Sequence, residues 1–115
     1  MKNIRVVVKK AGEPAELKWI VNELETYNKL VGGWIETFGL TDEILIVLNE
    51  EGKIKGLEPN LAIPCHGGMT EYIVGDIVFV SVDGQDFGGL SDRHLLDLLC
   101  IGVNIRGVDI ATLQP

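Results

Sequence analysis

The sequence predicts an α+β domain: a mixed, mainly antiparallel sheet of four to six strands with two helices packed on it. Apolar residues alternate or run unbroken over the short segments 34–40, 43–48 and 77–82, as is typical of strands. Apolar residues recur at helical spacing in two segments, 22–31 and 92–100. Tight polar turns join neighbouring strand segments, as antiparallel pairing allows. We expect the three named strands to form the centre of the sheet.

The first third of the chain contains two expected strands and a helix. Residues 4–8 are a short β-branched run, which favours a strand, and residues 17–21 indicate a second one. Asn22 is expected to cap the following helix, with Glu25 three residues later completing a capping box. The helix should end at Gly32-Gly33, because glycine adopts the left-handed conformation of a helix C-cap at little cost.

The middle of the chain alternates strands with polar turns. The unbroken apolar run 43–48 predicts a strand buried on both faces. The polar turn 49–53 follows, and residues 53–57 are expected to return as a brief strand. Residues 58–69 contain two prolines and two glycines, which predicts an irregular surface segment.

The last third begins with the strongest strand signal, residues 72–82, with a bulge or turn expected at 75–76. Ser91 is expected to cap a helix over 92–100, whose leucines form a wide apolar face. Residues 103–113 predict, from weaker evidence, one more strand.

Composition is that of a single globular domain over residues 1–115. Hydrophobic residues make up 46% and charged residues 23% of the chain. No segment reaches the roughly 20 consecutive apolar residues of a membrane helix, and the start of the chain lacks a signal-peptide pattern, so we expect a cytoplasmic protein without a membrane role. In that compartment Cys65 and Cys100 are expected as free thiols. We expect Trp19 and Trp34 in the core rather than as exposed stacking platforms.

Charge is unevenly placed along the chain. The net charge is -7, and residues 32–115 hold four Lys/Arg against thirteen Asp/Glu. An acidic surface repels phosphates, so direct nucleic-acid binding is not expected. The acidity either serves solubility or presents a face to a basic protein partner.

Two cysteines and two histidines are the residues with the most reactive side chains. Cys65 and His66 are adjacent, and His94 and Cys100 are six residues apart, so neither pair has the spacing of a zinc site. We therefore expect no metal and no cofactor. Cys65 with His66 or His94 as base would make a cysteine nucleophile. The alternative is a loop cysteine with ordinary thiol reactivity and an exposed histidine, and we expect this alternative.

Three segments carry a resemblance to a known family. They are 30–36 (LVGGWIE), 44–60 (ILIVLNEEGKIKGLEPN) and 73–99 (IVGDIVFVSVDGQDFGGLSDRHLLDLL). Their motifs and order resemble the small prokaryotic and phage family known as domain of unknown function 3846, over about residues 1–100. The resemblance implies no established activity and an accessory role in phages, plasmids or integrated elements. Leu61 stands where that family often has a basic residue, and residues 101–115 extend beyond the pattern.

These observations lead to an expected function of non-enzymatic accessory or interaction protein of a mobile element. The candidate interaction surface combines the polar turn with the Gly-Leu-Glu-Pro-Asn segment that follows, and comprises Asn49, Glu50, Glu51, Lys53, Pro59 and Asn60. Such residues also occur where only turn geometry requires them. Two alternatives are an acidic mimic of DNA that inhibits a DNA-binding protein, and a cysteine-dependent enzyme.

Overall fold

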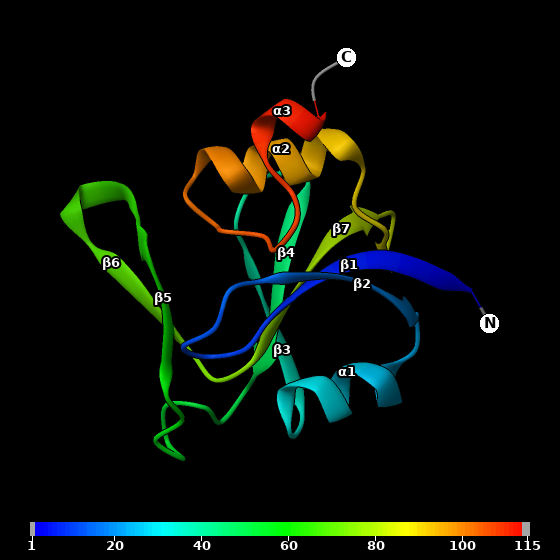
Figure 1. Cartoon of the computed structure of the whole chain (residues 1–115). Coiled ribbons are helices and arrows are strands. Elements are labelled where there is room, and N and C mark those ends of the chain that lie inside the picture. The colour runs from blue at the N-terminus through cyan, green and yellow to red at the C-terminus, as the bar shows by residue number, and fades with distance from the viewer. Residues whose placement is uncertain (1, 114–115) are drawn as a thin grey trace.

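The computed structural model describes residues 2–113 and shows an α+β fold, as predicted (Figure 1). One six-stranded antiparallel sheet has the order β2-β1-β7-β4-β3, with β8 pairing to the far end of β7. A separate antiparallel hairpin is formed by β5 and β6. The strands of the main sheet are β1 (Asn3–Lys9), β2 (Glu16–Val21), β3 (Ile35–Gly39), β4 (Ile44–Asn49), β7 (Ile77–Asp83) and β8 (Asp86–Gly88). The remaining elements are α1 (Leu24–Val31), β5 (Pro59–Pro64), the short 3₁₀ turn η1 (His66–Gly68), β6 (Thr70–Val74), α2 (Asp92–Cys100) and α3 (Ile110–Leu113).

The centre of the sheet differs in part from the expectation. Strand β7 is central and β4 lies beside it, but β3 is an edge strand and β1 takes the other place next to β7. The five residues Ile77 to Ser81 are all buried, since both faces of β7 are covered. Turn signals define which strands are neighbours in sequence, whereas the pairing of β1 with β7 joins segments about 70 residues apart.

The sheet separates two apolar cores. Alternate residues of a strand point to opposite faces, so Phe79 joins one core while Val78 and Val80 join the other. Helix α2 covers the Phe79 face with Leu95 and Leu98, and helix α1 covers the opposite face (Figure 1).

The helix ends confirm two expected caps and correct a third. Gly32 has φ 79° at the C-cap of α1, and the Ser91 side chain caps α2 by accepting from the His94 N–H. The N-cap of α1 is Glu23, without a side-chain hydrogen bond, so the predicted Asn22–Glu25 capping box is wrong. The Asn22 side chain instead donates to the Phe87 carbonyl and accepts from the Tyr27 hydroxyl, which joins α1 to β8.

Three predictions for the second half of the chain are also corrected. Residues 53–57 form a turn rather than a strand, and the segment predicted to be irregular contains strand β5. The chain turns at Gly75, where φ is 78°, at the place where a bulge or turn was expected, but the two parts of segment 72–82 are strands of different sheets. Asp76 stabilises this turn by accepting from the Ala11 N–H.

The C-terminal segment packs on the α2 side of the sheet instead of adding a full strand. Val103 and Ile105 are buried there, and Ile105 makes only isolated bridges, with Ala15 and Val108. The chain then ends its described part in α3, so the strand predicted over 103–113 is wrong. No helix among residues 2–113 is long and apolar enough to cross a membrane.

Both tryptophans are exposed, contrary to the expectation of core packing. Trp19 is 68% exposed on edge strand β2, and Trp34 is 64% exposed just before edge strand β3. Edge strands leave side chains with fewer neighbours, and the sequence did not reveal that β3 is an edge.

Candidate functional site

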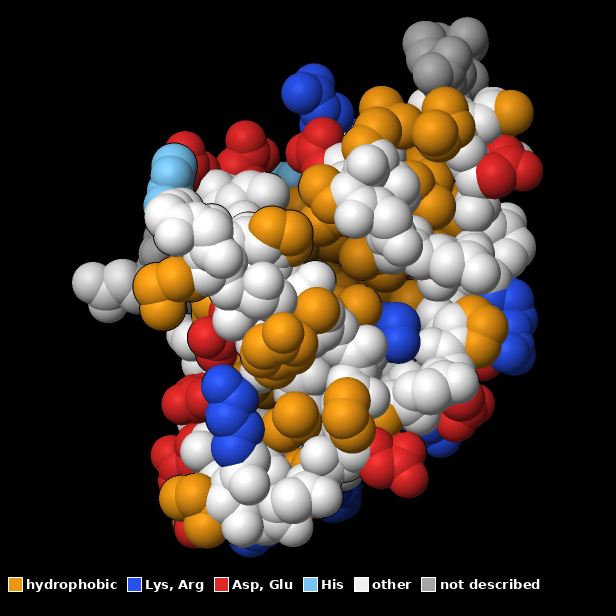
Figure 2. Space-filling view, turned by 90° about the vertical axis from the view of Figure 1, so that its left-hand side faces the viewer, with side chains coloured by type: hydrophobic (Ala, Val, Ile, Leu, Met, Phe, Trp, Pro, Cys, Tyr) orange, Lys and Arg blue, Asp and Glu red, His pale blue; other side chains and the backbone are white. Residues whose placement is uncertain are grey.

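A cleft separates the β5–β6 hairpin from the body of the molecule, and we call it the β5 cleft. It has a volume of about 480 Å³, within the usual range for ligand sites. Figure 2 looks onto this side and shows a hollow whose floor is made of apolar side chains. The residues that line the β5 cleft are Leu40, Thr41, Leu61, Ala62, Ile63, Pro64, Phe79, Ile101, Gly102 and Val103.

One wall of the β5 cleft is the backbone edge of strand β5. Four consecutive residues, 61–64, line this wall. Successive side chains of a strand point to opposite faces, so four in a row border one space only if that space follows the strand edge. In Figure 1, β5 lies on the side of the hairpin that faces the body near the hairpin tip, whereas β6 contacts β4 of the main sheet. The free edge of β5 borders the cleft, because residues 61–64 line it.

The hydrogen-bond pattern of the hairpin shows which backbone groups face the cleft. The Cys65 N–H donates to the Met69 carbonyl. Hydrogen-bonded and non-hydrogen-bonded pairs alternate in an antiparallel ladder, so Ile63–Glu71 and Leu61–Ile73 are bonded pairs and Ala62–Tyr72 is not. The N–H and C=O of Ala62 therefore point away from β6. Within residues 2–113 no hydrogen bond to either group is found.

The opposite wall comes from three separate parts of the chain. Leu40 and Thr41 belong to the turn between β3 and β4, Phe79 comes from the central strand, and the third part is residues 101–103 just after α2. Ile101 is 55% exposed although it is a large apolar residue. Gly102 has φ 100° and turns the chain here, which brings Val103 back into the core.

Asn60, which precedes the cleft residue Leu61, fixes the hairpin to the sheet. Its Nδ2 donates to the carbonyls of Lys9 (2.9 Å) and Gly75 (2.7 Å), and its Oδ1 accepts from Lys9 Nζ at 2.7 Å. Burial lowers the pKa of Lys9 below its ordinary value. A second link joins the polar turn to β6 through the Lys53–Glu71 ion pair at 3.2 Å.

The six residues of the predicted interaction surface divide into two kinds. Asn49 is buried, its Nδ2 donating to Val31 O and its Oδ1 accepting from the Glu51 N–H. Asn60 is half-buried and makes the three bonds described above. Both asparagines therefore have structural roles. The exposed members are Glu50, Glu51, Lys53 and Pro59. The prediction that these exposed residues contact a partner stays a prediction.

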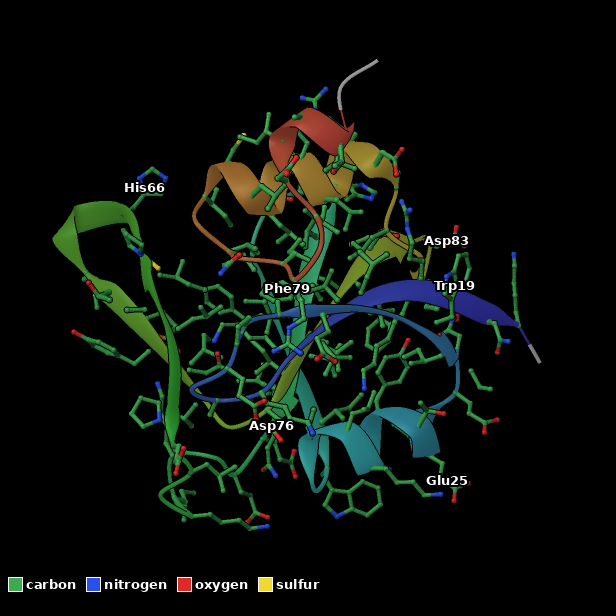
Figure 3. All side chains as sticks on the ribbon, in the orientation of Figure 1. Trp19, Glu25, His66, Asp76, Phe79 and Asp83 are labelled. Carbon is green, nitrogen blue, oxygen red and sulfur yellow. The ribbon has the colours of Figure 1, made fainter. Side chains whose placement is uncertain are left out.

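The reactive residues lie at two places and are exposed to different degrees. Cys65 and His66 are exposed at the tip of the hairpin, and Cys100 is exposed at the end of α2. Figure 3 shows His66 pointing outward from that tip. His94 is mostly covered rather than exposed as expected: its Nδ1 accepts from the Ser91 N–H and its Nε2 lies 2.9 Å from Glu43 Oε1.

The structure bears on two chemical alternatives, a thiol activated by His94 and a metal site. Both ring nitrogens of His94 already have partners, so neither is free to activate a thiol. Residues 2–113 hold no group of three or more His, Cys, Asp or Glu side chains that could bind a metal ion. The expectation of ordinary reactivity at Cys65 stays a prediction.

Comparison with protein-family models gives one match, to Domain of unknown function (DUF3846), over residues 3–99. The chain belongs to this family. The match confirms the resemblance drawn from the sequence and covers β1 through nearly all of α2. A search of curated proteins and a search of solved structures each found no match. Residues 101–103 of the β5 cleft lie beyond the region that the family model matches.

The sequence did not reveal the β5 cleft. Its two walls come from segments about 20 to 40 residues apart, and their approach depends on how the hairpin leaves the sheet. One signal was present: a Leu-Ala-Ile run between two prolines is consistent with a short edge strand, because proline is tolerated at strand ends and edges.

Proposed function

We propose that the protein is a non-enzymatic interaction protein that binds a segment of a partner protein in the β5 cleft. The observation that carries this proposal is an apolar cleft bordered by a strand edge whose Ala62 N–H and C=O point away from β6 and have no partner among residues 2–113. Exposed apolar surface of this kind commonly marks an interaction site. The bonds that both ring nitrogens of His94 already make count against a Cys65–His94 nucleophilic pair.

The wider role rests on the family resemblance. We propose that the partner belongs to a phage, plasmid or integrated element, or to the host cell that carries it. The acidic balance of residues 32–115 favours a basic partner.

A capture experiment tests the binding role. The protein is immobilised and exposed to a lysate of its own host cell, alongside the variants Ile101→Asp and Ile54→Asp. Both isoleucines are exposed, at 55% and 86%, so neither substitution disturbs the core, but only Ile101 lines the β5 cleft. We expect a specific partner whose capture falls at least tenfold with Ile101→Asp and is unchanged with Ile54→Asp, because a carboxylate in an apolar contact is costly.

Two results would contradict the proposal. If no protein is enriched over an unrelated bait, the interaction function is wrong. If the partner is captured equally by both variants, the β5 cleft is not the binding site. A third variant with Glu50, Glu51 and Lys53 changed to alanine tests the polar turn, and loss of capture there would place the contact on the predicted surface instead.

A further inference from the structure

We infer that the occupant of the β5 cleft is a short extended segment that adds to the free edge of β5 as a strand. This inference rests on the proposed function and specifies how the partner is recognised. Strand addition uses backbone hydrogen bonds for affinity and alternate side chains for specificity. The β5 cleft offers both elements, an open backbone edge and an apolar wall facing it.

The backbone edge sets the length of the occupant. Ala62 offers one donor and one acceptor to a single residue of an incoming strand. Pro59 and Pro64 begin and end β5 and have no N–H to donate. The accessible edge is therefore about four residues long by the spacing of a strand, and a long sheet-to-sheet contact cannot form on it. A second copy of this chain is thus a poorer fit than a short segment.

The apolar wall sets the pattern of the occupant. Leu40 is partly exposed and Ile101 is 55% exposed, and both border the cleft above the buried side chains of Phe79 and Val103. An added strand directs every second side chain to this wall and the others to solvent. The segment that fits has apolar, preferably β-branched, residues alternating with polar ones.

Acidic residues near the cleft indicate the charge expected at one end of the occupant. Thr41 lines the cleft and is followed by two exposed acidic residues, Asp42 and Glu43. Figure 2 shows Asp and Glu side chains gathered above the hollow. Lys9 does not line the cleft, and its Nζ is already bonded to Asn60 Oδ1. A basic residue at one end of the segment, close to Asp42, complements this arrangement.

A peptide probe tests the inference. The probe is a fluorescein-labelled Lys-Thr-Val-Thr-Val-Thr-Val peptide, and binding is measured by fluorescence polarisation. A copy with proline in place of each threonine lacks the backbone N–H groups at those positions and cannot form the hydrogen bonds of a strand pair. We expect the proline copy to bind at least tenfold more weakly. A copy with glutamate in place of lysine should bind at least threefold more weakly at low salt and should differ less at high salt.

Two variants of residue 62 separate strand addition from simple apolar contact. Ala62→Pro removes the edge N–H without breaking a bond to β6, since Ala62 and Tyr72 are a non-hydrogen-bonded pair. Ala62→Val keeps the N–H and serves as the matched control. We expect Ala62→Pro to bind the peptide probe at least tenfold more weakly than Ala62→Val does. Hydrogen exchange at the Ala62 amide should slow at least tenfold in the complex.

The outcomes distinguish this inference from the function on which it rests. Equal binding of the proline copy, or no effect of Ala62→Pro, would overturn strand addition. A partner whose capture depends on Ile101, with no binding of the peptide probe, would overturn strand addition and leave the binding function standing. The Ala62 amide could instead become protected from hydrogen exchange when only the protein concentration is raised, with dimers seen in sedimentation. That result would identify a second copy as the occupant and overturn the inference.

Discussion

Asn60→Ala is the substitution that most directly tests how the β5 cleft is held. The Asn60 side chain makes three hydrogen bonds, two to the carbonyls of Lys9 and Gly75 and one from Lys9 Nζ. A hydrogen bond contributes about 0.5–1.5 kcal/mol net, and one to a charged group about 1.5–3 kcal/mol. Water reaches this half-buried site and replaces part of the loss. We expect the free energy of unfolding to fall by about 2–3 kcal/mol.

Urea denaturation followed by circular dichroism measures this loss, with Asn104→Ala as the matched control. Asn104 is exposed, and it is its backbone carbonyl that accepts a hydrogen bond, from the Ala15 N–H. At about 4 °C per kcal/mol for a chain of this size, Asn60→Ala should lower Tm by about 8–12 °C, and the control should change the free energy of unfolding by less than about 0.5 kcal/mol.

The same variant also reports on the position of the hairpin. Losing the bonds to the Lys9 and Gly75 carbonyls frees β5 from the end of β1. Hydrogen exchange of the β5 and β6 amides should therefore accelerate more than exchange in β7. A loss of stability equal to that of Asn104→Ala, or acceleration spread evenly over the molecule, would refute this account of the hairpin.

Three further predictions concern single positions. Gly32→Ala should cost about 1–2 kcal/mol because Gly32 has φ 79°, whereas Gly39→Ala, in open space without a positive φ, should stay within about 0.5 kcal/mol in thermal denaturation. Burial raises the pKa of Tyr27 to about 12, against about 10 in the unfolded chain, so its contribution to stability is complete below pH 10 and is lost between pH 10 and 12. Unfolding measured over that range should show a shallower decline for Tyr27→Phe than for the native protein or for Tyr72→Phe. Cys65→Ser should change stability by less than about 0.5 kcal/mol, and Cys65 should react with iodoacetamide at pH 6 no faster than free cysteine does; labelling that greatly exceeds this rate would revive the enzymatic alternative.

Local signals in the sequence determined the parts of the fold that depend on near neighbours. Gly32 could be predicted as the end of α1, because the left-handed C-cap conformation favours glycine at that one position. Ser91 could be predicted as the cap of α2, because the bond from the His94 N–H to its side chain spans only three residues. Strand β7 could be predicted because both of its faces are covered, so its buried residues form an unbroken apolar run in the sequence. The family was also readable, since its motifs are contiguous stretches of sequence.

Three asparagines show which contacts could not be predicted from neighbouring residues in the sequence. Asn22 had the residue type and spacing of a helix cap, but in the fold its amide bonds Phe87 and Tyr27, 65 and 5 residues away. Asn49 and Asn60 resembled surface turn residues, and both join segments distant in sequence. An asparagine that makes a long-range bond looks the same in the sequence as one that faces solvent.

The sequence by itself determined the class of fold, most strands, both main helices and the family. Only the tertiary structure decided the order of the strands, the exposure of Trp19 and Trp34, the strand between Pro59 and Pro64, and the β5 cleft. The physical reason is that strand pairing is non-local: its bonds and burial depend on residues far along the chain, and the same local pattern suits a central strand, an edge strand or a loop.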